Sequence, residues 1–177
     1  MSNAAITVSK LDIGPCQVFF DGDDMGATLD NVVVNFKYEK ADLKSDQTGS
    51  AVLDQAVSGI DVTIETSVAM TREKATILKN LFKSADYAGT APADYLDFKD
   101  KVALRMLTLS KTLKLHPLVE ADAGKDYDWT FWKAIPTEES SYTFGPSEQG
   151  KMKIVWRVLL DMTTTPGRMF RYGDATL

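Results

Sequence analysis

Apolar and polar residues alternate along several stretches of the chain, and this pattern predicts β-strands. Over 31–39, the apolar Val32, Val34, Phe36 and Tyr38 alternate with Val33, Asn35, Lys37 and Glu39. Over 59–68, Ile60, Val62, Ile64 and Val68 alternate with Asp61, Thr63, Glu65 and Ser67. A period of two sends successive side chains to opposite faces of a strand. Each segment therefore predicts a strand with one buried face and one polar face.

Other stretches of the chain complete the set of expected elements. Further strands are predicted over 14–21, 101–109, 113–118, 127–132, 151–162 and 169–172, of which 151–162 alternates longest. Residues 40–58 lose the alternation and are polar, so they predict the long loop of an extended hairpin. Ala75, Leu78 and Phe82 recur at helical spacing, which predicts one helix over about 71–84.

Many strands with turn signals between them, and a single helix, predict a mainly β fold. We expect a β-sandwich or barrel with one flanking α-helix and a long extended β-hairpin loop. A length of 177 residues suits a single domain over 1–177.

Charge and cysteine content narrow the classes of function. The net charge of −5 argues against a protein that grips nucleic acid by its phosphates, which requires a basic surface. Cys16 is the only cysteine, so the chain forms no internal disulfide or cysteine zinc cluster, and we interpret Cys16 as a small core residue. No apolar run is long enough to span a bilayer, and residues 1–10 do not resemble a signal peptide. We expect synthesis in the cytoplasm and no membrane association.

Candidate chemistry is sparse, and we expect no catalytic, cofactor-binding or metal-binding residues. The single histidine, His116, is interpreted as a packed strand residue rather than a general base. The segment 21–26 begins like an EF-hand loop, but Met25 and Val32 occupy positions that need oxygen ligands, so a tight hairpin turn is expected instead. An aromatic cluster is expected to pack in the core on one side and in an interface on the other; it consists of Tyr127, Trp129, Phe131 and Trp132.

Several short motifs occur in an order that resembles the bacteriophage major tail tube protein family. After a first strand pair comes a long hairpin with Asp46-Gln47-Thr48-Gly49, then the segment 59–66 and a helix that follows Met70-Thr71. Later come Leu113-Lys114-Leu115-His116-Pro117 and Phe131-Trp132-Lys133-Ala134-Ile135-Pro136, and the end reads Phe170-Arg171-Tyr172-Gly173-Asp174. The resemblance covers roughly 12–174, and the fold is shared with contractile-tail and type VI secretion tube proteins.

The resemblance implies a structural protein of the virion tail, not an enzyme, that is made in the cytoplasm of the host bacterium. It implies hexameric rings that stack into a tube, with four strands per subunit forming a barrel around a lumen through which double-stranded DNA passes without specific binding. The implied partners are further copies of this chain together with tape-measure, tail terminator and baseplate or tail-tip proteins, and a sheath where the tail contracts.

The same implication assigns two groups of residues. The hairpin loop would contact the next ring, through the candidates Asp42, Lys44, Asp46, Gln47, Thr48 and Gly49. The polar strand faces would line the lumen, through the candidates Asn35, Lys37, Glu39, Asp61, Thr63 and Glu65. Acids outnumber bases in this second group, so we expect an acidic or neutral lining along which a polyanion slides.

Two other classes of function stay open. One is a small-ligand or carbohydrate-binding β-sandwich, for which the aromatic cluster would supply a stacking platform. The other is a hydrolase with an unrecognised site, in which His116 would be needed for activity.

Overall fold

The structure is a computed structural model in which strands dominate. It describes residues 15–44, 46, 50–69, 78, 81–82, 85–88, 95–98, 103, 105–118, 124–137, 140–143, 145 and 149–176. The elements in chain order are β1 (Cys16–Phe20), β2 (Asp23–Asp24), β3 (Val33–Leu43), β4 (Asp54–Ala69), β5 (Ala85–Ala88), β6 (Tyr95–Phe98), α2 (Met106–Leu109), β7 (Lys111–Pro117), β8 (Trp129–Pro136), β9 (Ser141–Thr143), β10 (Lys151–Val158) and β11 (Phe170–Tyr172).

Nine of these strands form one antiparallel sheet. Its order is β2-β1-β7-β8-β10-β4-β3, with β11 added beside β8 and β9 beside β10, while β5 and β6 pair separately. The sheet does not close on itself, so β3 forms a free edge of the described part of the chain. The prediction of a mainly β, sandwich-like fold is confirmed.

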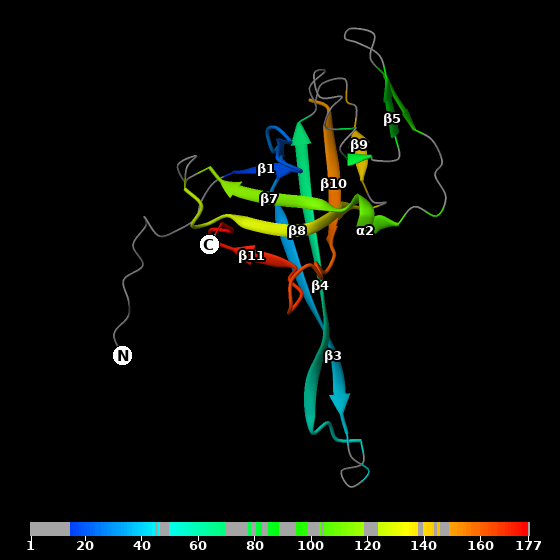
Figure 1. The fold of residues 1–177 in the computed structure, drawn as a ribbon, viewed down its shortest axis with the longest axis vertical. Coiled ribbons are helices and arrows are strands. Elements are labelled where there is room, and N and C mark those ends of the chain that lie inside the picture. Colours follow the sequence, from blue (N-terminus) through cyan, green and yellow to red (C-terminus); the bar gives the residue numbers. More distant parts are fainter. Residues whose placement is uncertain are drawn as a thin grey trace.

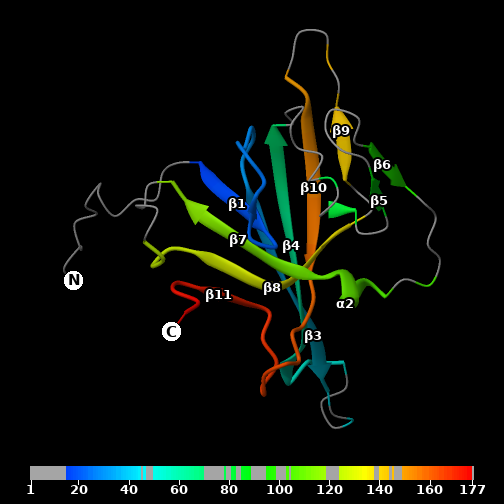
Figure 2. The ribbon, with the colours of Figure 1, turned by 45° about the horizontal axis from the view of Figure 1, so that its top comes forward.

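The sheet folds over so that its two halves face each other across the core. In Figure 1, β1, β7, β8 and β11 run across the molecule, whereas β3, β4 and β10 follow its long axis. Figure 2 shows the β1, β7 and β8 group lying over β4 and β10. Such crossing is typical of orthogonal sheet packing. The largest fully buried side chains come from both halves and include Trp156, Phe20, Phe131, Met25 and Ile64.

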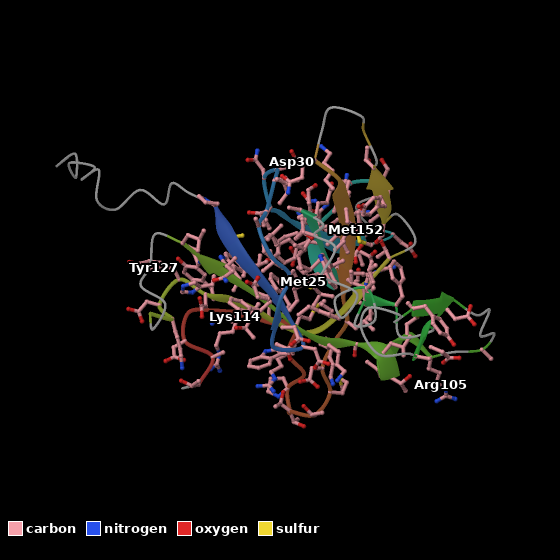
Figure 3. All side chains as sticks on the ribbon, turned by 90° about the horizontal axis from the view of Figure 1, so that it is seen from above. Met25, Asp30, Arg105, Lys114, Tyr127 and Met152 are labelled. Carbon is pink, nitrogen blue, oxygen red and sulfur yellow. The ribbon has the colours of Figure 1, made fainter. Side chains whose placement is uncertain are left out.

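Trp156 is the centre of this core and is held by a polar contact. Its ring centroid lies 4.7 Å from that of Phe20 on the opposite half of the sheet. The indole Nε1 donates a hydrogen bond to Oγ1 of Thr66 at 2.9 Å, so the one polar group of this buried side chain is satisfied. Viewed from above, Met25 and Met152 lie near the middle of the molecule, while Tyr127 and Arg105 lie toward opposite sides (Figure 3).

The long hairpin is more regular than the sequence suggests. Strands β3 and β4 pair continuously from Val33↔Glu65 to Leu43↔Asp54, with one irregularity between Glu39 and Lys40. They extend well beyond the rest of the sheet (Figure 1). The predicted loop over 40–58 is therefore wrong at both of its ends, which belong to strands. Side chains there are exposed on both faces, so no buried face imposes an alternation on the sequence, and backbone pairing alone carries the strands.

Two other predicted elements also need correction. The strand predicted over 101–109 is wrong, because Ala103 has a φ of 63° and Met106–Leu109 form the short helix α2. The strand predicted over 151–162 ends at Val158, and Asp161 instead pairs with Arg168 across a turn. Most of the helix predicted over 71–84 lies outside the described residues. Leu78 and Leu81 are helical, and the amide of Phe82 donates to the carbonyl of Leu78 at 2.9 Å.

No helix in the described part of the chain combines the length and the apolar character needed to cross a membrane.

Candidate functional site

The six residues predicted to line a lumen share one face of the sheet. Residues that are directly paired in an antiparallel ladder point to the same side. The register pairs Asn35 with Thr63 and Lys37 with Asp61, and it continues this face to Glu39 at one end and Glu65 at the other. Ile64 and Val62 point to the opposite side and are fully buried in the core. The predicted separation of a core face from a polar face is therefore present in β4. In β3 the predicted buried face is wrong, because Phe36 and Tyr38 are 42% and 57% exposed. That the polar face borders a lumen stays a prediction.

Strand β10 extends this face with residues that the sequence did not assign to it. It pairs with β4 through Val155↔Glu65 and Arg157↔Thr63, so its odd-numbered residues join the same side. We call this combined surface the polar face; it consists of Asn35, Lys37, Glu39, Asp61, Thr63, Glu65, Lys151, Lys153 and Arg157. The alternation in the sequence over 151–162 already places Lys151, Lys153 and Arg157 on the opposite side of the strand from its apolar even-numbered residues. What the sequence did not reveal was that this strand lies beside β4.

Two of the three acids on the polar face are paired with cations. Glu65 Oε2 lies 2.7 Å from Nζ of Lys153, and Asp61 Oδ1 lies 3.2 Å from Nε of Arg157. A third pair joins Nζ of Lys151 to Oδ2 of Asp30, in the segment before β3, at 3.2 Å. Acids outnumber bases among the six predicted residues, but β10 adds Lys151, Lys153 and Arg157 to the same face, so the polar face as a whole has no excess of acids.

Asp30 shows the electrostatic effect of this arrangement most directly. A hydrogen bond from Lys151, a second from Ser67 and the charge of Lys151 together lower the pKa of the Asp30 carboxyl below its ordinary value. The carboxylate is therefore ionised at neutral pH, and the pair with Lys151 joins two full charges. Asp30 lies at the margin of the molecule in Figure 3.

Where β8 continues the sheet, the polar face is hollowed. A shallow, open depression of about 430 Å³ lies between Met106 of α2 and the strands, and it is lined by Asp61, Thr63, Met106, Ile135, Pro136, Thr137, Val155 and Arg157. Its walls mix a charged pair with apolar side chains. Among the described residues, no group of three or more His, Cys, Asp or Glu side chains is placed to hold a metal ion.

The predicted ring-contacting residues are only partly described. Asp42 belongs to β3 rather than to a loop, and its Oδ1 accepts a hydrogen bond from Nε2 of Gln55 at 3.0 Å. Lys44 lies 4.0 Å from the Asp42 carboxylate, and Asp46 is exposed. Gln47, Thr48 and Gly49 lie outside the described residues. The described end of the hairpin also exposes apolar side chains that sequence reasoning did not single out: Leu43, Val52, Leu53 and Val57.

His116 is buried beside an acid. Its Nδ1 lies 2.6 Å from Oδ1 of Asp128, and Oδ2 of Asp128 lies 2.6 Å from Nζ of Lys114. Only 3% of His116 and 2% of Asp128 are exposed, so a substrate has no access to the pair. Among the described residues, nothing forms a hydrogen bond with the Nε2 of His116, where a general base would hold its nucleophile. The geometry fits the packed histidine expected from the sequence.

Cys16 and the segment 21–26 have local structural roles. Burial raises the pKa of the Cys16 thiol, which packs against the core, so the reactive thiolate is disfavoured. Asp21 and Gly22 have φ angles of 57° and 90° and join the ladder pair Phe20↔Asp23, as a two-residue hairpin turn requires. The predicted tight turn is confirmed. The Asp21 carboxylate lies 2.9 Å from Nζ of Lys111.

The aromatic cluster divides between two surroundings. Phe131 is fully buried, and Trp129 contacts Phe170 and Tyr172 with centroid distances of 6.0 and 4.9 Å. Trp132 lies apart under the guanidinium of Arg168, whose Cζ is 3.7 Å from the ring centroid. The rings thus pack largely against one another and against Arg168, and they do not form an open stacking platform.

The sequence matches no known protein-family profile and no curated protein sequence. Its fold does match solved structures. One is a chain from the cryo-EM structure of an extracellular contractile injection system, the PVC sheath–tube complex in the extended state. The superposition gives a TM-score of 0.54 at 10% sequence identity, and it covers 97% of this chain and 99% of the other. At this identity the likeness establishes a shared fold over almost the whole of both chains.

Proposed function

We propose that this protein is a structural subunit of a phage-type tail tube, forming stacked hexameric rings through which double-stranded DNA passes. The observation that carries the proposal is the shared fold, end to end, with a chain of a contractile injection system. In its general form, the proposal assigns this protein a structural role in a tail. In its specific form, it adds the hexameric ring, the passage of DNA and the kind of machine that the tube belongs to. The tape-measure, terminator, baseplate or tail-tip and sheath partners belong to the same proposal, as does a place in the virion tail.

The free edge of β3 supports assembly into rings. An edge strand of eleven residues presents unpaired backbone groups and invites uncontrolled association unless another chain covers it. A closed ring of identical subunits covers every such edge, because each copy receives the edge of its neighbour.

The hairpin supports stacking of these rings. Leu53 and Val57 are 60% and 59% exposed near its described end, and Leu43 is 49% exposed. Apolar side chains on a projecting hairpin bury area only against another molecule. A neighbouring ring is the partner that this proposal supplies.

The polar face supports a role as the wall of a water-filled channel. Its charged side chains stay hydrated while the opposite side of β4 and β10 packs into the core. No observation favours the two other functions to the same degree, since the aromatic rings contact each other and the His116–Asp128 pair is buried.

Negative-stain electron microscopy and mass photometry across a concentration series test the proposal. We expect rings and tubes at high subunit concentration. The variant Leu53→Ser should form rings that do not stack, whereas the matched control Leu118→Ser, 51% exposed at the end of β7, should stack normally. A protein that stays monomeric at millimolar concentration would contradict the proposal.

A further inference from the structure

The cations of β10 form a regular row on the polar face. Lys151, Lys153 and Arg157 occupy odd positions of one strand and therefore point to the same side. At a rise of roughly 3.3 Å per residue, they are spaced about 7 and 13 Å apart along the strand. Three exposed or half-buried cations in line are what a polyanion needs for salt-dependent binding.

Each cation in the row is instead occupied by a carboxylate from another segment. Lys153 lies directly opposite Ser67 in the ladder but reaches Glu65, two residues away. Arg157 is displaced in the same way: the ladder places it opposite Thr63, and it contacts Asp61. Lys151 completes the row by pairing with Asp30. The same diagonal offset therefore pairs Lys153 and Arg157 with two acids that lie four positions apart on β4.

These contacts are poorly explained as devices for stability. The side chains of the Lys153–Glu65 pair are 49% and 40% exposed, and those of the Arg157–Asp61 pair are 56% and 31% exposed. Ion pairs this exposed contribute little to folding, since water screens them and the long side chains lose freedom. Their larger effect is on the field that the polar face presents to a charged molecule.

We propose that Asp30, Glu65 and Asp61 mask the cations of β10, so that the polar face does not bind polyanions. The acids of this face act by holding neighbouring cations in neutral pairs, rather than by repelling DNA with an excess of negative charge. Masking is a property of the single subunit. Its consequence, that double-stranded DNA passes the wall without being held, rests on the proposed function.

The test removes the masking acids and measures DNA binding by the monomer. The triple variant Asp30→Asn, Asp61→Asn and Glu65→Gln changes the net charge from −5 to −2. The control Asp24→Asn, Asp46→Asn and Asp54→Asn makes the same change at exposed positions off this face, where the described contacts involve no cation. A third protein adds Lys151→Gln, Lys153→Gln and Arg157→Gln to the first variant and restores the net charge to −5.

Fluorescence anisotropy with a labelled duplex of about 20 base pairs supplies the readout. We expect the triple variant, which lacks the masking acids, to bind at least tenfold more tightly than the control in low salt, and to lose this gain in high salt. The third protein should bind as weakly as the wild type. Equal binding by the triple variant and the control would overturn the proposal. The double variant Asp61→Asn, Glu65→Gln, which keeps Asp30, serves as the second test of the same difference if the triple variant does not fold.

Assembled tubes separate this inference from the proposed function. DNA held by tubes of the triple variant should be protected from nuclease if the polar face borders the lumen. Nuclease-sensitive DNA on intact tubes, or a failure of every variant and the wild type to assemble, would contradict the proposed function alone. The anisotropy measurement on monomers tests the masking proposal whatever result the tubes give.

Discussion

Arg157 and Asp61 form an ion pair across two neighbouring strands, with 3.2 Å between Nε and Oδ1. The pair lies on the polar face, on the opposite side of β4 from the fully buried Val62 and Ile64. A contact this exposed tunes the charge of a surface more than it stabilises the fold. The same reasoning separates the residues whose loss should affect folding from those whose loss should affect only the surface.

The Arg157–Asp61 pair should make a small contribution to stability. In a double-mutant cycle of Arg157→Ala and Asp61→Ala, urea denaturation should give a coupling free energy below about 1 kcal/mol. The coupling should shrink further in high salt, because exposed charges are screened. A coupling of several kcal/mol would show that the pair is structural, and the masking role would lose its support.

Thr66 and Thr63 offer a matched pair of substitutions on one strand. Thr66→Val leaves the indole N–H of the buried Trp156 without its acceptor and should lower the free energy of unfolding by about 1–3 kcal/mol. Thr63→Val, on the polar face, should change it by less than about 0.5 kcal/mol. Urea denaturation of the monomer measures both. Similar losses from the two variants would mean that the assignment of the faces is incorrect.

Asp128 should be among the most sensitive polar residues for stability. Asp128→Ala leaves His116 buried without its partner and removes the contact with Lys114, so we expect a loss of about 3 kcal/mol. Asp21→Ala is the control, because it also breaks an acid–lysine contact, with Lys111, but at an exposed site. It should cost no more than about 1 kcal/mol. Chemical denaturation distinguishes the two, and equal effects would contradict the account of the cluster.

Asp161 should make the turn before β11 sensitive to acid. Hydrogen bonds from Thr163 and the neighbouring Arg168 lower the pKa of the Asp161 carboxyl despite its burial. A carboxyl whose pKa is lower in the folded state stabilises the fold fully above its unfolded pKa of about 3.9, and the effect is lost as the pH falls through the folded value. The variant Asp161→Asn should therefore be less stable than the wild type at pH 7.

The difference between these two proteins should begin to shrink as the pH falls below about 4, and it should be lost as the pH falls through the lowered pKa of the folded state. Thermal denaturation of both proteins between pH 3 and pH 7 checks this. A difference that is constant over the whole range would show that the carboxylate charge of Asp161 is unimportant.

Where one face of a strand is buried, the sequence predicted the structure well. Over 59–68 the alternation correctly separates Val62 and Ile64 from Asp61 and Thr63, because the core accepts apolar side chains on one side alone. The turn at Asp21-Gly22 was also predictable, since its left-handed backbone favours these residue types. Both successes rest on local constraints that act within a few residues.

The failures occur where such constraints are missing or act over a long range. The outer hairpin is exposed on both faces, so the strand ends near Leu43 and Asp54 left no pattern. The apolar run over 101–109 fits a strand or a short helix equally well, and α2 forms there. The pairing of β4 with β10 joins residues about ninety positions apart, and this pairing determines which cations meet Asp61 and Glu65. Without it, the polar face appeared acidic, whereas the cations of β10 leave it with no excess of acids.

Cryo-EM of assembled tubes, at a resolution that shows side chains, tests the central claim most directly. The account predicts stacked hexameric rings in which Asp61, Glu65 and Arg157 border the lumen and the β3–β4 hairpins contact the next ring. A tube whose polar face points outward or packs between subunits would contradict it, as would a protein that forms no rings at any concentration.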